Sequence, residues 1–341
     1  MMLMRLEVGS ALTTDGLRFS EKFGRCIRQD PPAQLGVPTM DLALLALRRG
    51  AQDDALALNR YMVDEFKIVY DTILNRWLHQ IFEYTLPRLG AEKLETALRV
   101  PRTHAWNAFF EVGKGFNNEA ASAIEAAEVE RAALLLDHTR RIFKTINDEM
   151  VFFIQDILTA LDEAYGEDEP IRAQRGPYET IWRDRYRNWE EYTPEEQLQL
   201  TCEGMRAHYG GPTRHGEFEV IDDGDRYRLV FNPCGTGGIL RHGDPETGAP
   251  PWSTTGVNRT PRPYTWGKTG VPWYCTHCSL YLEHWAAEDY GWPIRPVLYN
   301  ATQDGPSTSW LIYKGRGSVH AEDYERIGLT PPPGAPRESM R

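Results

Sequence analysis

The sequence predicts an α+β fold, in which a helical N-terminal bundle packs on a smaller α/β C-terminal domain with antiparallel strands. Between residues 37 and 210, apolar side chains recur every three or four positions, which is the period of amphipathic helices. After Gly210, Gly211 and Pro212, short segments alternate polar and apolar residues, as half-buried strands do. We therefore expect four parts: an irregular arm over 1–36, a helical domain over 37–210, an α/β metal- and ligand-binding domain over 211–328, and a flexible tail over 329–341.

Two segments, 53–85 and 118–165, carry the longest helical patterns. Each pattern stops close to a proline, Pro87 or Pro170, because proline lacks the N–H group that would continue the helix. A further helix is expected after Thr193, since threonine caps helix N-termini and a proline and two glutamates follow it. Long helices joined by short breaks are typical of a bundle.

The C-terminal part has the residue pattern of a small antiparallel sheet. Residues 217–231 predict a β-hairpin, because two alternating segments flank the turn sequence Asp-Asp-Gly-Asp. The Gly- and Pro-rich stretch 234–272 predicts a long loop, and its aromatic residues favour an ordered one. A helix over 276–290 and strands near 294–300 and 309–314 complete this part.

Composition and charge limit the classes of function. The net charge of −11 and the absence of Lys/Arg-rich runs disfavour nucleic acid as a partner. No apolar run approaches the roughly 18–20 residues of a membrane-spanning helix. The apolar residues at the start of the sequence are too few and too interrupted for the apolar region of a signal sequence, so we expect none. We expect a cytoplasmic protein that acts on a small molecule, has no nucleic-acid or membrane partner, and forms homo-oligomers, if any, through its helical domain.

The five cysteines are an odd number, which disfavours a disulfide framework and favours reduced thiols. Cys202 lies within a helical pattern and is expected in the core, whereas Cys26 receives no role. Cys275 and Cys278 form a Cys-x-x-Cys pair, the most informative feature of the chain. Without a metal, this pair could be buried core thiols, or a redox pair at a helix N-terminus that lacks a thioredoxin-like context.

A metal site is the leading interpretation of the thiols. A Cys-x-x-Cys pair can bring two thiolates to one ion, and Cys234, which directly follows a predicted strand, is the natural third ligand beside Cys275 and Cys278. His277, His242, a carboxylate or water would be the fourth. Three protein ligands with a water would make a catalytic site, and four protein ligands a structural one. Zinc is the expected metal, with iron as the alternative.

Cys234 also has an interpretation of its own. It lies in the glycine-rich segment 232–238, whose glycines permit backbone conformations that expose N–H groups to an anion. Cys234 would then be a nucleophile beside an oxyanion site. A plain turn after a strand is the alternative.

His277, Glu283 and His284 are the candidate catalytic groups, because they lie next to the thiols in sequence and could move protons in a suitable pocket. At about 100° per residue, a regular helix turns Cys278 and His284 to different faces, so these two would not bind one ion. The alternative for Glu283 and His284 is that they are exposed helix residues.

Three tryptophans of the C-terminal third, Trp252, Trp266 and Trp273, are the candidate walls of a ligand pocket. Aromatic side chains suit a flat or apolar small molecule. Ordinary core packing is the alternative for them.

Residues 195–314 resemble the small-ligand domain shared by 4-vinyl reductases and L-2-amino-thiazoline-4-carboxylate hydrolase-like proteins. The resemblance lies in the order of parts: a helix ending in His208-Tyr-Gly-Gly, a hairpin whose second strand delivers Cys234, a cysteine-bearing helix and two final strands. It implies zinc binding through cysteines and the binding or conversion of small organic molecules. Two features depart from it: Ser309-Trp310 stands where those families tend to place another cysteine, and the loop over 238–272 is unusually long.

Together these observations predict a metal-dependent enzyme that acts on a small organic molecule, aromatic or heterocyclic, by hydrolysis or lysis. One alternative is a non-catalytic ligand-binding or sensor protein with a structural zinc. The other is a metal-free enzyme that uses Cys234 as its nucleophile.

Overall fold

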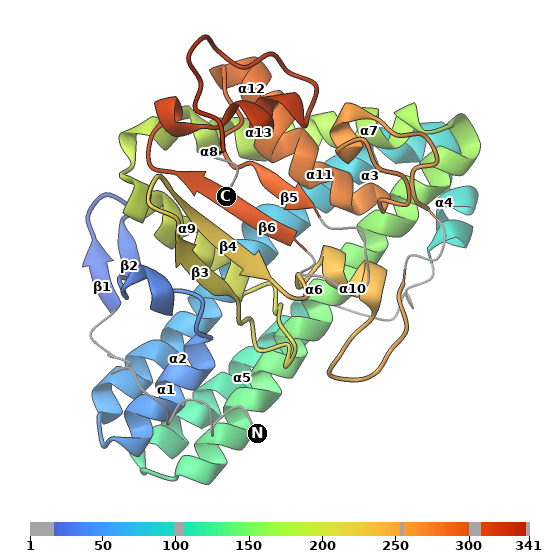
Figure 1. Ribbon diagram of the computed structural model, residues 1–341. Coiled ribbons are helices and arrows are strands. Elements are labelled where there is room, and N and C mark those ends of the chain that lie inside the picture. Colours follow the sequence, from blue (N-terminus) through green and yellow to red (C-terminus); the bar gives the residue numbers. More distant parts are fainter. Residues whose placement is uncertain (1–16, 99–105, 253–255, 300–307, 339–341) are drawn as a thin grey trace.

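The computed structural model describes residues 17–98, 106–252, 256–299 and 308–338, and it confirms the α+β fold (Figure 1). Helices dominate the first part of the chain and a small antiparallel sheet lies in the C-terminal part. The helical segments from residue 39 to residue 206 are α1 (Thr39–Arg48), α2 (Gln52–Lys67), η3 (Ile68–Asn75), α3 (Arg76–Leu89), α4 (Ala91–Ala97), α5 (Trp106–Glu125), α6 (Val129–Tyr165), α7 (Asp168–Pro177), η4 (Tyr178–Trp182), α8 (Arg183–Arg187), η5 (Trp189–Glu191) and α9 (Pro194–Arg206).

Helix α6, which is 37 residues long, runs through the molecule and carries the central apolar face of the helical part (Figure 1). Leu136, Phe143, Met150 and Ile157 follow one another at intervals of two helical turns, and all four side chains are fully buried. Helix α5 packs along α6. The periodicity of the sequence therefore corresponds directly to the face that forms the core.

The structure confirms the predicted start of α9 but not the predicted end of α3. The Thr193 hydroxyl accepts a hydrogen bond from the Glu196 N–H (3.2 Å), and the Glu196 carboxylate accepts one from the Thr193 N–H (2.8 Å), so α9 begins in a capping box as expected. The run expected to stop at Pro87 instead continues to Leu89, with Pro87 in the last turn of α3. It ends at Gly90, whose φ of 76° lies in the left-handed region that glycine adopts without strain.

The sheet has four antiparallel strands in the order β3-β4-β6-β5 (Figure 1). The expected hairpin is formed by β3 (Glu219–Asp222) and β4 (Arg226–Phe231), and the expected later strands are β5 (Val297–Tyr299) and β6 (Thr308–Tyr313). Strand β6 is central, and all six of its residues are buried. The remaining helical segments are α10 (Gly237–His242), η6 (Pro263–Thr265), η7 (Trp273–Cys275), α11 (Thr276–Ser279), η8 (Leu280–His284), α12 (Trp285–Tyr290), η9 (Arg316–Ser318) and α13 (Ala321–Glu325).

Part of the N-terminal segment, which was expected to be irregular, forms a second, two-stranded sheet. Strands β1 (Leu17–Ser20) and β2 (Arg25–Arg28) pair antiparallel, and the short helix η2 (Pro32–Gln34) follows them. Ion pairs hold this hairpin: Lys22 lies 2.6 Å from Glu196, and Arg25 pairs with Glu203 of α9. Each strand has only four residues, and the Leu17-Arg18-Phe19-Ser20 alternation of β1 does not correspond to a buried face, so the sequence pattern is too short to predict the hairpin. The expected arm residues 1–16 lie outside the described part.

One hydrophobic core joins the helices to the sheet. Its buried members include Phe66 and Met150 from the helices and Leu229 and Ile312 from the sheet. A second, smaller cluster lies between α1, α2, α5 and the start of α6. The segments before and after residue 210 therefore share their largest core.

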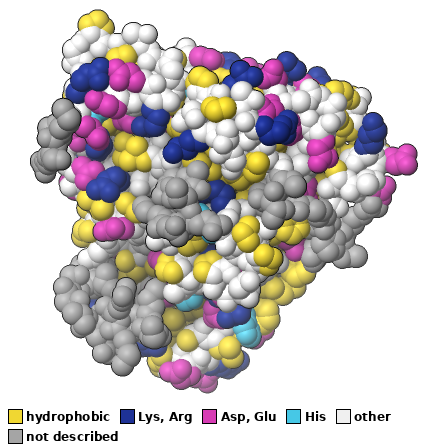
Figure 2. All heavy atoms as spheres, turned by 45° about the vertical axis from the view of Figure 1, so that its right-hand side comes forward, with side chains coloured by type: hydrophobic (Ala, Val, Ile, Leu, Met, Phe, Trp, Pro, Cys, Tyr) yellow, Lys and Arg dark blue, Asp and Glu magenta, His cyan; other side chains and the backbone are white. Residues whose placement is uncertain are grey.

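The described part of the predicted tail contacts the rest of the chain. The Ala321 N–H donates to the Pro336 carbonyl (2.7 Å), and Arg226 donates to Glu338 (2.6 Å). No helix among the described residues is long and apolar enough to cross a membrane. On the face in Figure 2, the described acidic and basic side chains are interspersed.

Candidate functional site

The three cysteines of the predicted metal site lie in one neighbourhood. Cys275 ends η7, Cys278 lies one turn later in α11, and Cys234 arrives from the end of β4. Burial raises the pKa of Cys275 to about 12, and the nearby Cys234 adds to this effect. Burial, with Cys234 and Cys275, also raises the pKa of Cys278 well above its ordinary value. Yet in the described part of the chain, no three His, Cys, Asp or Glu side chains are arranged to hold a metal ion.

The glycines beside Cys234 allow close packing. A Cβ atom on Gly237 would lie 2.7 Å from the Cys275 sulfur, and one on Gly235 would lie 1.9 Å from the His208 carbonyl oxygen. The Cys234 sulfur lies 3.6 Å from the Thr236 hydroxyl. Glycine at 235 and 237 is therefore required by the approach of neighbouring atoms.

Cys278 and His277 form a thiol–imidazole pair. The Cys278 Sγ atom lies 3.5 Å from the His277 Nε2 atom, within reach of an S–H···N contact. The other ring nitrogen, Nδ1, lies 2.6 Å from the Tyr274 carbonyl oxygen, which can only accept a hydrogen bond. Nδ1 therefore carries the proton, and Nε2 presents a lone pair to the thiol.

The surroundings keep this pair uncharged at neutral pH. Burial lowers the pKa of His277 to about 4, and the nearby His208 and Arg295 contribute in the same direction. The His277 ring also packs edge-on against Trp77, with 4.9 Å between the ring centroids. His277 and Cys278 nevertheless both retain accessible surface. The pair is thus a neutral imidazole beside a neutral thiol, held in a fixed orientation.

Glu283, a second predicted catalytic group, is fully buried and saturated with hydrogen bonds. Its carboxylate accepts from the Trp266 indole (2.8 Å), from the Val297 N–H (2.8 Å) and from Arg326 (2.9 Å). Burial raises the pKa of Glu283 to about 7, although Arg326 opposes the shift. These contacts connect the long loop, β5 and the C-terminal segment. Glu283 therefore stabilises the fold.

His284, the third predicted catalytic group, faces the long loop. Burial lowers its pKa, and a hydrogen bond with the Pro263 carbonyl opposes the shift. Segment η8, which contains both Glu283 and His284, is π-helical. The regular-helix argument that compared the faces of Cys278 and His284 therefore does not apply, because a π-helix has a different angle per residue.

The three predicted pocket tryptophans each donate an indole hydrogen bond to a carboxylate. Trp252 donates to Asp156 (3.0 Å), and Trp273 donates to Asp162 (3.1 Å), both on α6. Trp266 donates to Glu283 and stacks on Tyr299, with 4.4 Å between the ring centroids. Trp273 is fully buried. These residues connect the long loop to α6 and to the sheet domain. Trp266 is the one nearest the thiols, because the Tyr299 ring on which it stacks lies close enough to Cys275 to influence its pKa.

Cys26, Cys202 and His242 lie outside the group formed by Cys234, Cys275 and Cys278. Cys202 is fully buried, which confirms its place in the core, and Cys26 is exposed on β2. His242 lines a separate cavity with Asn232 and Pro233. Sequence reasoning missed two neighbours of the thiol–imidazole pair, His208 and Arg295. No pattern identifies them, because each is a single residue far from the pair along the chain.

No protein-family model, curated protein or solved structure matches this chain. The resemblance to 4-vinyl reductase-type domains therefore stays a prediction.

Proposed function

We propose that the chain is an enzyme that hydrolyses a small organic molecule with Cys278 as nucleophile and His277 as its base. One observation carries the proposal: the Cys278 sulfur lies 3.5 Å from the unprotonated nitrogen of His277, and the Tyr274 carbonyl fixes that ring. A nucleophile, a base within hydrogen-bonding reach and a third group that orients the base are the parts of an activated nucleophile.

The chemistry follows from the proton positions. The Cys278 sulfur attacks an acyl carbon of the substrate while its proton passes to His277 Nε2. The imidazolium then gives that proton to the leaving group, and a thioester remains on Cys278. Water hydrolyses the thioester with His277 again as the base, which regenerates the thiol. Because the pKa of Cys278 is raised and that of His277 is lowered, the proton moves during the attack and not beforehand.

The positive charge of Arg295 supports this role. Arg295 lies close enough to lower the pKa of Cys278 against the larger effect of burial. A cation near the sulfur also stabilises negative charge that develops on an attacked carbonyl. Cys278 thereby replaces Cys234 as the candidate nucleophile, since the contact with a histidine belongs to Cys278.

The test is acylation by an activated ester, p-nitrophenyl acetate, followed by peptide mass mapping. Acyl transfer to Cys278 is expected in the wild-type protein and in the Cys26→Ala control, which removes an exposed thiol. His277→Gln should slow acylation of Cys278 by about 100-fold, because glutamine keeps a donor for Tyr274 but accepts no proton. Acylation of Cys278 at an unchanged rate in His277→Gln would contradict the proposal.

A metal-dependent hydrolase or lyase is the second candidate, favoured by the closeness of Cys234, Cys275 and Cys278. Zinc, or iron, would polarise the substrate or activate water. Elemental mass spectrometry decides between the two candidates. One metal ion per chain that disappears in Cys275→Ser would favour the metal enzyme, whereas metal-free protein that still acylates Cys278 would exclude it.

A further inference from the structure

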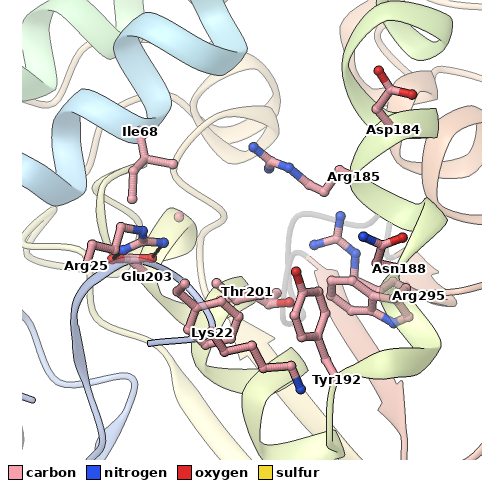
Figure 3. Close-up of a pocket in the computed structure, with 14 residues that line it drawn as sticks. Lys22, Arg25, Ile68, Asp184, Arg185, Asn188, Tyr192, Thr201, Glu203 and Arg295 are labelled. Atoms are coloured by element: carbon pink, nitrogen blue, oxygen red, sulfur yellow. Dashed lines mark hydrogen bonds and ion pairs between the residues drawn. The ribbon is translucent and has the colours of Figure 1, made fainter. Parts of the chain in front are cut away.

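A cavity of about 370 Å³ lies between the β1–β2 hairpin, α8 and α9 (Figure 3). Its volume is within the roughly 300–1,000 Å³ of small-molecule sites. Four basic side chains line it: Lys22, Arg25, Arg185 and Arg295. Two acidic side chains, Asp184 and Glu203, also line it. The excess of positive charge stands out in a chain whose net charge is −11.

Two of the four basic side chains that line the cavity, Arg185 and Arg295, form no ion pair with a described residue. Lys22 pairs with Glu196 at 2.6 Å, and Arg25 pairs with Glu203. The exposed Asp184 is engaged by Arg187 at 2.7 Å. Every lining carboxylate is thus taken, and Arg185 and Arg295 have no acidic partner among the described residues.

Arg185 reaches from α8 into the open space of the cavity (Figure 3). The described residues offer it no hydrogen bond or ion pair. Burial lowers the pKa of Arg185 to about 10, and the neighbouring Arg295 adds to this effect. A lowered pKa means that the fold disfavours the positive charge, so an anion beside Arg185 would relieve a real cost.

Arg295 is held beside the same cavity by aromatic rings. It is only 6% exposed, and its guanidinium lies 5.3 Å from the Tyr186 ring centroid and 5.4 Å from that of Trp189. One of its terminal nitrogens donates to the Tyr186 hydroxyl, and its Nε atom has no partner. The rings fix the guanidinium without neutralising it.

We propose that this cavity binds a small organic anion through a carboxylate or phosphate group held by Arg185 and Arg295. Guanidinium groups match the planar oxygens of carboxylates and phosphates with paired hydrogen bonds. The ring of Trp189 lines the same space and can pack against the organic part of the ligand. This cavity shares Arg295 with the proposed thiol site, but its test measures anion binding and does not depend on the acylation of Cys278.

The experiment is isothermal titration of the full chain with benzoate and with phenyl phosphate, which distinguishes the two anionic groups. Benzyl alcohol is the neutral control, and ionic strength is kept constant. At least one anion should bind saturably with a Kd below about 1 mM, and benzyl alcohol should not bind. Arg185→Gln should weaken binding by roughly 10- to 100-fold, the usual result of losing hydrogen bonds to a charged group.

Two further variants protect the test against misfolding. Arg131→Gln removes an exposed arginine at the start of α6 and should bind like the wild type. Arg185→Lys keeps the charge without the paired donors, so its affinity should fall between the wild type and Arg185→Gln. The proposal is overturned if neither anion binds the wild-type protein, or if folded Arg185→Gln binds as well as Arg131→Gln.

Discussion

Two regions of this molecule treat partly or fully buried basic side chains in opposite ways. In the first region, basic and acidic side chains from α6 and from the loops after it form ion pairs. We call this region the paired cluster; its members are Arg140, Lys144, Arg214, Asp137, Asp148, Asp244 and Glu246. In the second, the cavity lined by Arg185 and Arg295, the described residues supply no acidic partner to either of them.

The paired cluster is held by short hydrogen bonds between opposite charges. Arg140 donates to Glu246 at 2.6 Å and to Asp137 at 2.7 Å, while Lys144 donates to Asp244 at 2.7 Å. The fully buried Arg214 donates to Asp148 at 2.7 Å. These bonds fasten the loop around residue 244 to α6.

The charges of the paired cluster stabilise the fold, whereas we infer that the charges of the cavity serve to bind a ligand. Removing an ion from water costs several kcal/mol, which a buried partner offsets only with good geometry. The paired cluster meets that condition inside the chain. The cavity does not meet that condition for Arg185, so the charge of Arg185 costs stability until a ligand supplies a negative charge.

The largest expected effect comes from breaking the paired cluster. Arg214→Met should destabilise the protein by about 3–5 kcal/mol, because it leaves Asp148 buried without its cation. Urea denaturation measures the change. Arg131→Met, which removes a 58% exposed side chain, should change stability by less than about 0.5 kcal/mol. Equal effects of the two substitutions would show that the paired cluster does not hold the fold.

Acid should weaken the paired cluster in a defined pH range. Burial alone would raise the pKa of Glu246, but hydrogen bonds from Arg140 and Lys144 lower it from 4.5 to about 2. A lowered pKa means that the stabilisation is complete above pH 4.5 and is lost as the pH falls toward 2. The loss should be on the order of 2 kcal/mol.

Glu246→Gln is the matched variant for this measurement. It should be less stable than the wild type at pH 7, and the difference should shrink as the pH falls from 5 to about 2. A constant difference across this range would mean that Glu246 does not titrate as the ion pairs require.

Adding a carboxylate to the cavity should have the smallest effect on stability, and it tests directly whether Arg185 and Arg295 lack an acidic partner. Asn188 lines the cavity beside the two arginines (Figure 3), and Asn188→Asp adds a carboxylate of nearly the same shape. The substitution should stabilise the free protein by roughly 0.5 kcal/mol and should weaken the binding of benzoate or phenyl phosphate. Stronger anion binding in this variant would contradict the assigned role of the cavity.

The sequence predicted most of the fold because most elements follow local rules. The buried positions of α6, the capping box at Thr193 and the hairpin over 217–231 all have periodic or turn patterns that act over a few residues. The β1–β2 hairpin escaped prediction because its anchors are ion pairs to α9, 174 residues away for Lys22 and Glu196.

The candidate site was predictable to a smaller extent. The spacing of Cys275 and Cys278, with Cys234 after a strand, predicted three neighbouring thiols that bind a metal. In the structure Cys234 and Cys275 lie close enough to influence the pKa of Cys278, and the metal site stays a prediction. The tryptophans proved harder to assign, because each indole donates to a carboxylate that is distant in sequence or in a different element. Arg185 and Arg295 are 110 positions apart, and only the folded chain brings them to one cavity.

The measurement that tests the comparison most directly is the free energy of unfolding of Arg185→Met, with and without benzoate or phenyl phosphate. Without an anion, the variant should be more stable than the wild type by about 1 kcal/mol, because a half-buried, unpaired guanidinium has been removed. With the anion, the wild type should gain stability and the variant should not. An Arg185→Met protein that is less stable than the wild type without an anion, as expected for Arg214→Met, would show that Arg185 serves the fold and would contradict the account.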